Sequence, residues 1–371
     1  MTMDMRVRIL GILLGLGSTT VGAQESSFHV QLRLDYLSAR QMLAFFDGSG
    51  RAGDVAGLRG SQLALTTGAA LARQTIPVEA LAQMLDGVRS HRGQAGDILQ
   101  LAGAYRNRKQ ISALLDEIQR QDFAGTVAAT VEQLFPGGTS ITTSIPVYFV
   151  GFGSPNIDAY ERRVSWNGDT PIAATEPAGE PVIVVNLGQT VVYGRSPQEQ
   201  LRSTVGVVAH EVFHAVIDAY KERSGAWRSF HAQHRREFDQ LLELAHNEGI
   251  AYYLTLIQNS RGYLREDWVP KVRQAFIDFN AYGRELISPA TPTQRKADLM
   301  RMANTSEYWN NYGAITGMII ARSIDQKLGR DALRETIALG PYDFFLKYFE
   351  LARNNPEFPP PGPDVLHYFG R

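Results

Sequence analysis

Apolar residues recur at helical spacing through much of this chain. In the first third, three segments carry the pattern clearly: Leu37–Phe46, Val78–Leu85 and Ile111–Ile118. Five glycines between residues 48 and 60 mark a loop between helices, and Pro136-Gly137-Gly138 ends the region. We therefore expect residues 28–135 to be helical, with their apolar stripes buried as ordinary core.

The pattern changes after residue 138. Ser144–Phe152 is rich in β-branched and aromatic residues and predicts a strand, and Pro181–Asn186 predicts a second, buried strand. The segments 153–158 and 166–180 are typical of loops. Helical periodicity returns at Ser196 and continues to the end of the chain. The predicted fold class is mostly α with a small β-sheet (α+β).

The first 23 residues differ from the rest. Arg6 and Arg8 precede a nine-residue apolar run, Ile9–Gly17, and Val21-Gly22-Ala23 offers small residues for cleavage before Gln24. This order is typical of a secretory signal peptide, and the apolar run is too short to span a bilayer. We expect a signal peptide at 1–23, a helical N-terminal domain at 24–138 and a second domain at 139–371. We therefore expect the protein to be periplasmic or secreted, with no stable insertion in the membrane after cleavage.

Composition narrows the possible chemistry. The 371 residues are 44% hydrophobic and 20% charged, as in globular proteins. Lys and Arg total 37 against 38 Asp and Glu, so no basic field predicts a nucleic-acid partner. The absence of cysteine excludes disulfides, a thiol nucleophile and any zinc site that uses cysteine. Because there are only eight histidines, their positions are informative.

Two histidines lie one turn apart on a predicted helix. Ser196 and Glu199 form a capping box, and Pro197 suits the first helical position, so a helix should run from Pro197 to Arg223. His210 and His214 then share a face, and both imidazoles can reach one metal ion. Glu211 is rotated by about 100° and lies beside that ion. This is the His-Glu-x-x-His arrangement of zinc peptidases.

The surroundings of the motif favour a metal site. Apolar residues cover nearly every side of the helix, which predicts that it is buried: Val205, Val207, Val208, Val212, Phe213, Val216 and Ile217. Buried histidines and carboxylates must be paired or bind metal, because isolated buried charge is costly. The alternative is a core helix whose histidines are merely hydrogen-bonded.

Zinc in a catalytic site takes a third protein ligand, and helical phase selects Glu248. Phe238–Ile257 predicts one helix, on which Glu248 lies in the middle of an apolar stripe while Glu243 and His246 face elsewhere. Small residues at Ala245, Gly249 and Ala251 should let this helix approach the histidine helix. The alternative for Glu248 is a carboxylate buried against an arginine.

Two more histidines, His231 and His234, are spaced three residues apart. They could form a second metal site. The competing interpretation places them on the surface among Arg228, Arg235 and Arg236.

The stretch His210-Glu-Val-Phe-His214-Ala-Val-Ile-Asp218, followed by Asn247-Glu248, resembles the gluzincin group of zinc metallopeptidases, the thermolysin-like peptidases. The form Asn247-Glu248-Gly-Ile-Ala251, 34 positions after His214, and the later Tyr312-Gly-Ala-Ile-Thr-Gly317-Met318 are more similar to secreted zinc-dependent peptidases of unknown substrate in the same clan. The resemblance implies a gluzincin-like domain with a zinc-binding helix hairpin, in which His210, His214 and Glu248 bind one Zn²⁺ per chain. It also implies that Glu211 is the general base.

Helical phase and the expected chemistry suggest further roles, and the resemblance implies one for a strand. Asp218, one turn past His214, and Asn247 would support the ligands from behind. Tyr312 is the candidate donor to the oxyanion, with a core aromatic as the alternative. The strand Val182–Asn186 would pair with an extended substrate. A peptide or protein substrate is expected. The alternatives are an inactive binding or scaffold protein of this fold and a zinc hydrolase of a non-peptide substrate.

Overall fold

The computed structural model describes residues 28–91, 97–174, 178–258, 268–304, 308–355 and 358–370. Its strands are β1 (Phe28–Asp35), β2 (Ile141–Val150), β3 (Ala159–Asn167), β4 (Thr170–Ala173) and β5 (Glu180–Asn186). The helices before and between the strands are α1 (Leu37–Phe46), α2 (Ala52–Ala56), α3 (Arg59–Leu71), α4 (Val78–Arg89), α5 (Leu101–Arg106), α6 (Arg108–Arg120) and α7 (Phe123–Glu132).

Helices make up the rest of the chain. They are α8 (Leu187–Thr190), α9 (Pro197–Arg223), α10 (Gly225–Gln233), α11 (Glu237–Gln258), α12 (Trp268–Ile287), α13 (Thr293–Ala303), α14 (Tyr312–Leu328), α15 (Arg330–Leu339), α16 (Pro341–Asn354) and α17 (Pro363–Tyr368). Two short 3-10 helices, η1 (Val191–Tyr193) and η2 (Tyr308–Asn310), join them. The predicted class, mostly α with a small sheet, is confirmed.

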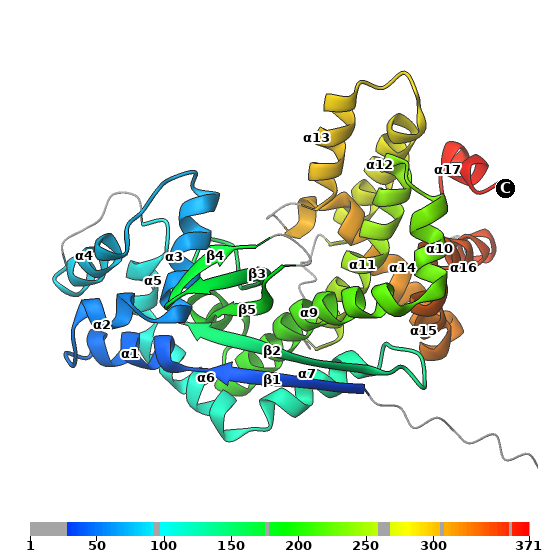
Figure 1. Ribbon diagram of the computed structural model, residues 1–371. Coiled ribbons are helices and arrows are strands. Elements are labelled where there is room, and N and C mark those ends of the chain that lie inside the picture. Colours follow the sequence, from blue (N-terminus) through cyan, green and yellow to red (C-terminus); the bar gives the residue numbers. More distant parts are fainter. Residues whose placement is uncertain are drawn as a thin grey trace, which may run out of the picture.

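The five strands form one mixed sheet in the order β1-β2-β5-β3-β4. β1, β2 and β5 are parallel, whereas β3 runs antiparallel to both β5 and β4. In Figure 1, α3 lies above the sheet and α6 and α7 lie below it. Helix α9 crosses behind the sheet and continues into the C-terminal helices, so it connects the two halves of the molecule.

The expectation that residues 28–135 are helical was wrong at the start of the region. Phe28–Asp35 is a strand that pairs with β2 in register from Phe28 and Ile141 to Asp35 and Tyr148. Its alternation of apolar and polar residues has a period of two, and Val30 and Leu32 are the buried members. The helical segment and the second predicted domain therefore contribute strands to the same sheet.

The other strand predictions were mostly correct. Both predicted strands exist, as β2 and β5, and each is buried over most of its length. The segment 166–180 was wrongly expected to be loop throughout, because β4 lies within it and pairs Thr170 with Asn167. With only four residues, one of them proline, β4 is too short to show a periodic pattern.

The N-terminus of α9 has the predicted cap. Ser196 Oγ accepts a hydrogen bond from the Glu199 amide at 3.3 Å, and Pro197 occupies the first turn. Glu199 Oε2 in turn accepts from the amide of Arg195 at 2.7 Å, one residue before the position expected of a capping box. The cap fixes the start of the helix and hence the phase of the histidines on it.

Helix α11 is held from behind by α14 at a pair of glycines. A Cβ on Gly317 would lie 1.7 Å from the carbonyl oxygen of Ala245, and one on Gly249 would lie 2.2 Å from the carbonyl carbon of Gly317. The two backbones are thus in direct contact. Ala245 and Gly249 were expected to serve the approach to the histidine helix. Instead they serve the approach to α14.

Among the described residues, no helix combines the length and apolar character needed to cross a membrane. The predicted signal peptide, residues 1–23, lies outside the described residues.

The glycine contact predicts a clear stability effect. Gly317→Ala should lower the free energy of unfolding by at least ~2 kcal/mol, because backbone atoms cannot move aside as a flexible side chain can. Thermal and denaturant unfolding measure this loss. Gly53→Ala is the matched control, since nothing lies within 4 Å of a Cβ on this exposed α2 residue. Equal stability of the two variants would contradict the close contact.

Candidate metal centre

Three ligand-type side chains meet where α9 crosses α11. His210 Nε2 lies 3.2 Å from His214 Nε2 and 3.7 Å from Glu248 Oε2, and His214 Nε2 lies 3.5 Å from the same oxygen. Their side chains are between 15% and 20% exposed, so the group faces a restricted opening. The structure therefore brings together the three residues that helical phase selected.

The spacing of these atoms fits zinc. Tetrahedral zinc with bonds of about 2.0–2.1 Å places neighbouring ligand atoms about 3.3–3.4 Å apart. The three observed separations, 3.2, 3.5 and 3.7 Å, lie close to that value. Two imidazoles and one carboxylate are a common catalytic zinc set, which leaves a fourth position for water or substrate. The residues present thus fit the ion in both chemistry and spacing.

Further contacts orient the ligands. The imidazole of His210 forms a hydrogen bond with the backbone carbonyl of Ala251 on α11, which fixes the ring and leaves Nε2 facing the other ligands. The Asn304 side chain, just after α13, forms a hydrogen bond with the carboxylate of Glu248. Neither partner was predicted, because a backbone acceptor and a residue 56 positions away leave no spacing signal.

His210, His214 and Glu248 shift one another's pKa values strongly. Burial, with the neighbouring His214, lowers the pKa of His210 to about 3. Burial also opposes charge on His214 and Glu248, but their mutual attraction outweighs it. The pKa of His214 is therefore raised to about 9, and that of Glu248 is lowered to about 2.

Glu211 lies beside this group and is held by the sheet. Its Oε2 accepts a hydrogen bond from the backbone amide of Glu161 on β3 at 2.9 Å. Burial raises the pKa of Glu211 to about 8, and the negative charges of Asp158 and Glu248 act in the same direction.

Asp158 is a second carboxylate at this position, and sequence reasoning missed it. It directly precedes β3, and its carbonyl accepts from the Asn186 amide at 2.8 Å. Its charge raises the pKa of both Glu211 and Tyr252. The sequence placed residue 158 in a loop, and only the β3–β5 pairing brings it to the site.

Tyr312 is not among the side chains gathered here. Its hydroxyl donates to the carbonyl of Leu299 at 3.0 Å, and its ring packs against Tyr282 and Phe279 of α12. Tyr252 lies next to the ligands instead, with its ring centroid 5.2 Å from that of His210. Tyr252 follows Glu248 by one turn of α11, so both side chains lie on the same face of the helix. This spacing is the sequence signal that could have identified Tyr252.

Asp218 and Asn247, the two residues expected to support the ligands, have their nearest partners elsewhere. The Asp218 carboxylate is half exposed, lies 3.5 Å from Lys221 Nζ and acts on His214 through its charge. Asn247 lies beside His246, whose buried ring packs against Trp227 and Phe344. His246 and Glu243 do face other partners, as helical phase predicted.

His231 and His234 do not form a second metal site. His231 Nε2 lies 3.1 Å from Glu243 Oε2, and the same carboxylate accepts from Lys221 at 2.8 Å. His234 stacks on Phe230 and lies 3.6 Å from Asp239. Within the described residues, one group of three His, Asp or Glu side chains is placed to hold a metal: His210, His214 and Glu248.

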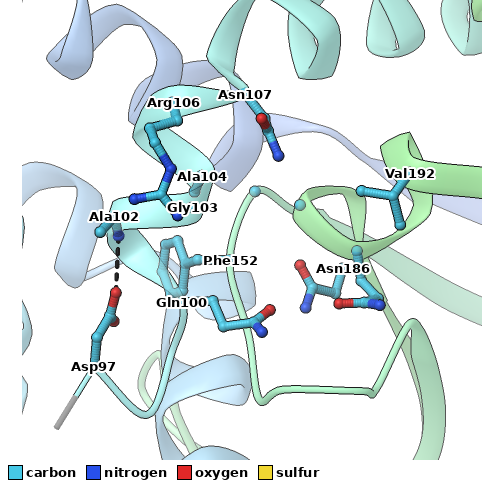
Figure 2. Close-up of a pocket in the computed structure, with 13 residues that line it drawn as sticks. Asp97, Gln100, Ala102, Gly103, Ala104, Arg106, Asn107, Phe152, Asn186 and Val192 are labelled. Carbon is cyan, nitrogen blue, oxygen red and sulfur yellow. Dashed lines mark hydrogen bonds between the residues drawn. The ribbon is translucent and has the colours of Figure 1, made fainter.

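A separate pocket of about 270 Å³ opens at the carboxyl ends of β2 and β5 (Figure 2). Gln100, Arg106, Asn107 and Asn186 are among the residues that line it. Asn186 also donates from Nδ2 to the carbonyl of Ile157 at 3.1 Å, and so connects the pocket wall to the segment before β3.

A family model matches residues 79–357, three quarters of the chain. The family is described as "Putative zinc dependent peptidase (DUF5700)". The chain belongs to this family. The matched part of this zinc-dependent peptidase family member contains both histidines, Glu211 and Glu248. Neither the curated proteins nor the solved structures contain a match to the chain.

Metal binding should depend on Glu248 and not on Glu243. We expect about one zinc per chain in the purified protein and none in His214→Ala. In Glu248→Gln the affinity for zinc should fall more than ~100-fold, because loss of a residue that only hydrogen-bonds to a ligand already lowers metal affinity 10–100-fold. Glu243→Gln is the control, because it alters a carboxylate on the same helix that pairs with Lys221. Competition with a chromogenic chelator measures the affinities. Similar values for the two Gln variants would remove Glu248 from the ligand set.

Proposed function

We propose that this protein is a zinc metallopeptidase of the His-Glu-x-x-His gluzincin group, which hydrolyses peptide bonds with Glu211 as the general base. One observation carries the proposal. Three candidate ligand atoms lie 3.2–3.7 Å apart, close to tetrahedral spacing, and the Glu211 carboxylate beside them is held by the Glu161 amide at 2.9 Å. This constellation serves the activation of water for attack on a carbonyl.

When bound, zinc would lower the pKa of water and polarise the scissile carbonyl. Glu211 accepts the proton of the attacking water at its carboxylate and later passes it to the departing amine nitrogen. The Glu161 amide holds Oε2 of Glu211, so the carboxylate keeps one orientation during both transfers. The hydrogen bond between the His210 imidazole and the backbone of Ala251 would leave Nε2 of His210 to hold the metal.

The expected pairing of substrate with Val182–Asn186 is wrong. This strand is β5, and it is paired along both edges, with β2 on one side and β3 on the other. Its main-chain donors and acceptors are therefore used within the sheet. Of the strands that contact α9, β3 is the one whose backbone touches the proposed base.

The arrangement of helices around the site also supports the proposal that the protein is a gluzincin. Both histidines lie on one helix and the carboxylate ligand on the next long helix, α11, with α10 as the connection. This is the helix hairpin implied by the motif. We further propose that the protein is exported, because its first 23 residues have the order of a signal peptide.

Glu211→Gln tests the role of the base. The variant should bind zinc as the wild type does, while peptide hydrolysis falls by at least ~1000-fold, because a neutral amide cannot accept the proton. A peptide library analysed by mass spectrometry identifies the cleaved bond, and metal analysis reports occupancy. Retained hydrolysis would exclude Glu211 as the base. Hydrolysis of esters or amides but of no peptide by the wild type would favour the non-peptide hydrolase, and no hydrolysis at all would favour a binding protein.

Export predicts a defined N-terminus. Protein recovered from the periplasm or medium of a secreting bacterial host should begin at or near Gln24, as measured by intact mass and N-terminal sequencing. Substituting Val21 and Ala23 by arginine should block processing at that position. Exported protein that still carries residues 1–20 would contradict the signal peptide.

A further inference from the structure

The pocket at the carboxyl ends of β2 and β5 has no role in the proposed peptidase reaction. None of the described residues that line it belongs to the candidate metal centre. Its volume of about 270 Å³ is far larger than the roughly 10–15 Å³ that one water needs, so a small organic molecule fits. Ligands commonly bind in the crevice beyond the carboxyl ends of parallel strands. The pocket therefore has the place and the size of a binding site of its own.

A buried amide lies at the floor of this pocket. Asn186 is only 3% exposed, and within the described part of the chain its Oδ1 has no hydrogen-bond partner. Its Nδ2 is already used, because it donates to the carbonyl of Ile157 at 3.1 Å. A Cβ on Gly188, which also lines the pocket, would lie 3.2 Å from Oδ1, so the glycine keeps a side chain away from this oxygen. A buried acceptor without a donor is costly, and an O–H or N–H group of a ligand would satisfy it.

Three more carboxamides line the pocket, those of Gln100, Asn107 and Gln189. Their side chains form no hydrogen bond with any other residue that the structure describes. Gln100 has a left-handed backbone with φ of 52°, a conformation that costs energy in any residue but glycine. In Figure 2, Gln100 and Asn186 point toward each other across the pocket. Because a carboxamide both donates and accepts, this wall suits a polar ligand.

Arg106 is the positive side chain at the rim of the pocket. It is exposed, and no described residue pairs with its guanidinium. Its Nη2 lies 3.9 Å from the position of a Cβ on Gly103, so the guanidinium folds back over a glycine of the pocket wall. The carboxylate of Asp97 is used elsewhere, because its oxygens accept from the amides of Leu101 at 2.8 Å and Ala102 at 2.9 Å. The unpaired guanidinium favours an anion that stays at the rim, where water still hydrates both charges.

We propose that this pocket binds a small carboxylate that also carries an O–H or N–H donor. The carboxylate pairs with Arg106 at the rim, and the donor reaches Oδ1 of Asn186 at the floor, with the free carboxamides between them. Hydroxy acids, amino acids and N-acylamino acids have both groups. Binding at this site requires neither zinc nor peptide hydrolysis, so it goes beyond the proposed peptidase function.

A panel of small carboxylates tests the binding directly. Lactate, malate, glutamate and N-acetylalanine are titrated into the purified full chain, and ligand-observed NMR measures the affinity of each. We expect at least one of them to bind saturably. The primary amide of that compound, which lacks the negative charge, should bind about tenfold more weakly, as loss of one charged hydrogen bond predicts. Methylation of its O–H or N–H donor should also weaken binding.

Two substitutions locate the binding site. Arg106→Gln should weaken the bound carboxylate about tenfold and should abolish the difference between the acid and its amide. Gly103→Leu should prevent binding, because its side chain would extend from a position between Arg106 and Gln100, at ordinary contact distances from both. Lys109→Gln is the matched control, since it removes an exposed positive charge of α6 that does not line the pocket. Thermal unfolding establishes that each variant retains its fold.

The outcomes separate the pocket from the metal centre. Failure of every carboxylate in the panel to bind would refute the site. Equal binding by the wild type and Arg106→Gln, or by the acid and its amide, would overturn the assignment of the carboxylate to Arg106. Glu211→Gln should bind the same carboxylate as tightly as the wild type does, so loss of the peptidase proposal would leave this one standing.

Discussion

The contact between the backbones of α11 and α14 at Gly249 and Gly317 determines the geometry of the candidate metal centre. One turn of α11, from Glu248 to Tyr252, supplies the candidate carboxylate ligand, the Ala251 backbone that binds His210, and the tyrosine that packs on that imidazole. The side of this turn that carries Gly249 lies directly on α14, with no side chain between. A displacement of α11 by the width of one methyl group would move all three groups together, and a shift of that size is large compared with the tolerance of a metal site.

Charge explains why these groups require a partner. Two imidazoles and two carboxylates lie within a largely buried crossing of helices, and each changes the proton affinity of the others. The carboxylate of Glu248 and the imidazole of His214 attract each other, and this attraction lowers the pKa of the first and raises that of the second. A divalent cation would neutralise the carboxylate and accept both imidazoles as ligands. The orientation of the Glu211 carboxylate is set by the backbone of a strand, β3, and not by the helices.

Local patterns predicted the parts of the site that lie on single helices. Ser196, Pro197 and the apolar stripe of α9 defined the phase of His210 and His214, and the stripe of α11 selected Glu248. Residues whose positions depend on tertiary pairing could not be found in this way. Asp158 reaches the site through the β3–β5 pairing, and Asn304 reaches it from the end of α13. The sequence pattern favoured Tyr312 over Tyr252, but the Tyr312 hydroxyl donates to the carbonyl of Leu299. Apolar and polar residues alternate along β1, but the strong helical pattern of the residues that follow it led to the prediction of a helix.

The pairing of β1 with β2 has a consequence for the order in which the chain folds. Phe28 meets Ile141, 113 positions later, whereas Lys221 and Glu243, which join α9 to α11, are only 22 apart. Closing the longer loop costs more chain entropy, and contacts of large sequence separation form slowly. The helix pair that carries the proposed metal ligands can therefore assemble early from nearby segments. Strand β1 pairs with β2 only after residues beyond 140 have become ordered, so Phe28–Asp35 is among the last segments to reach its final place.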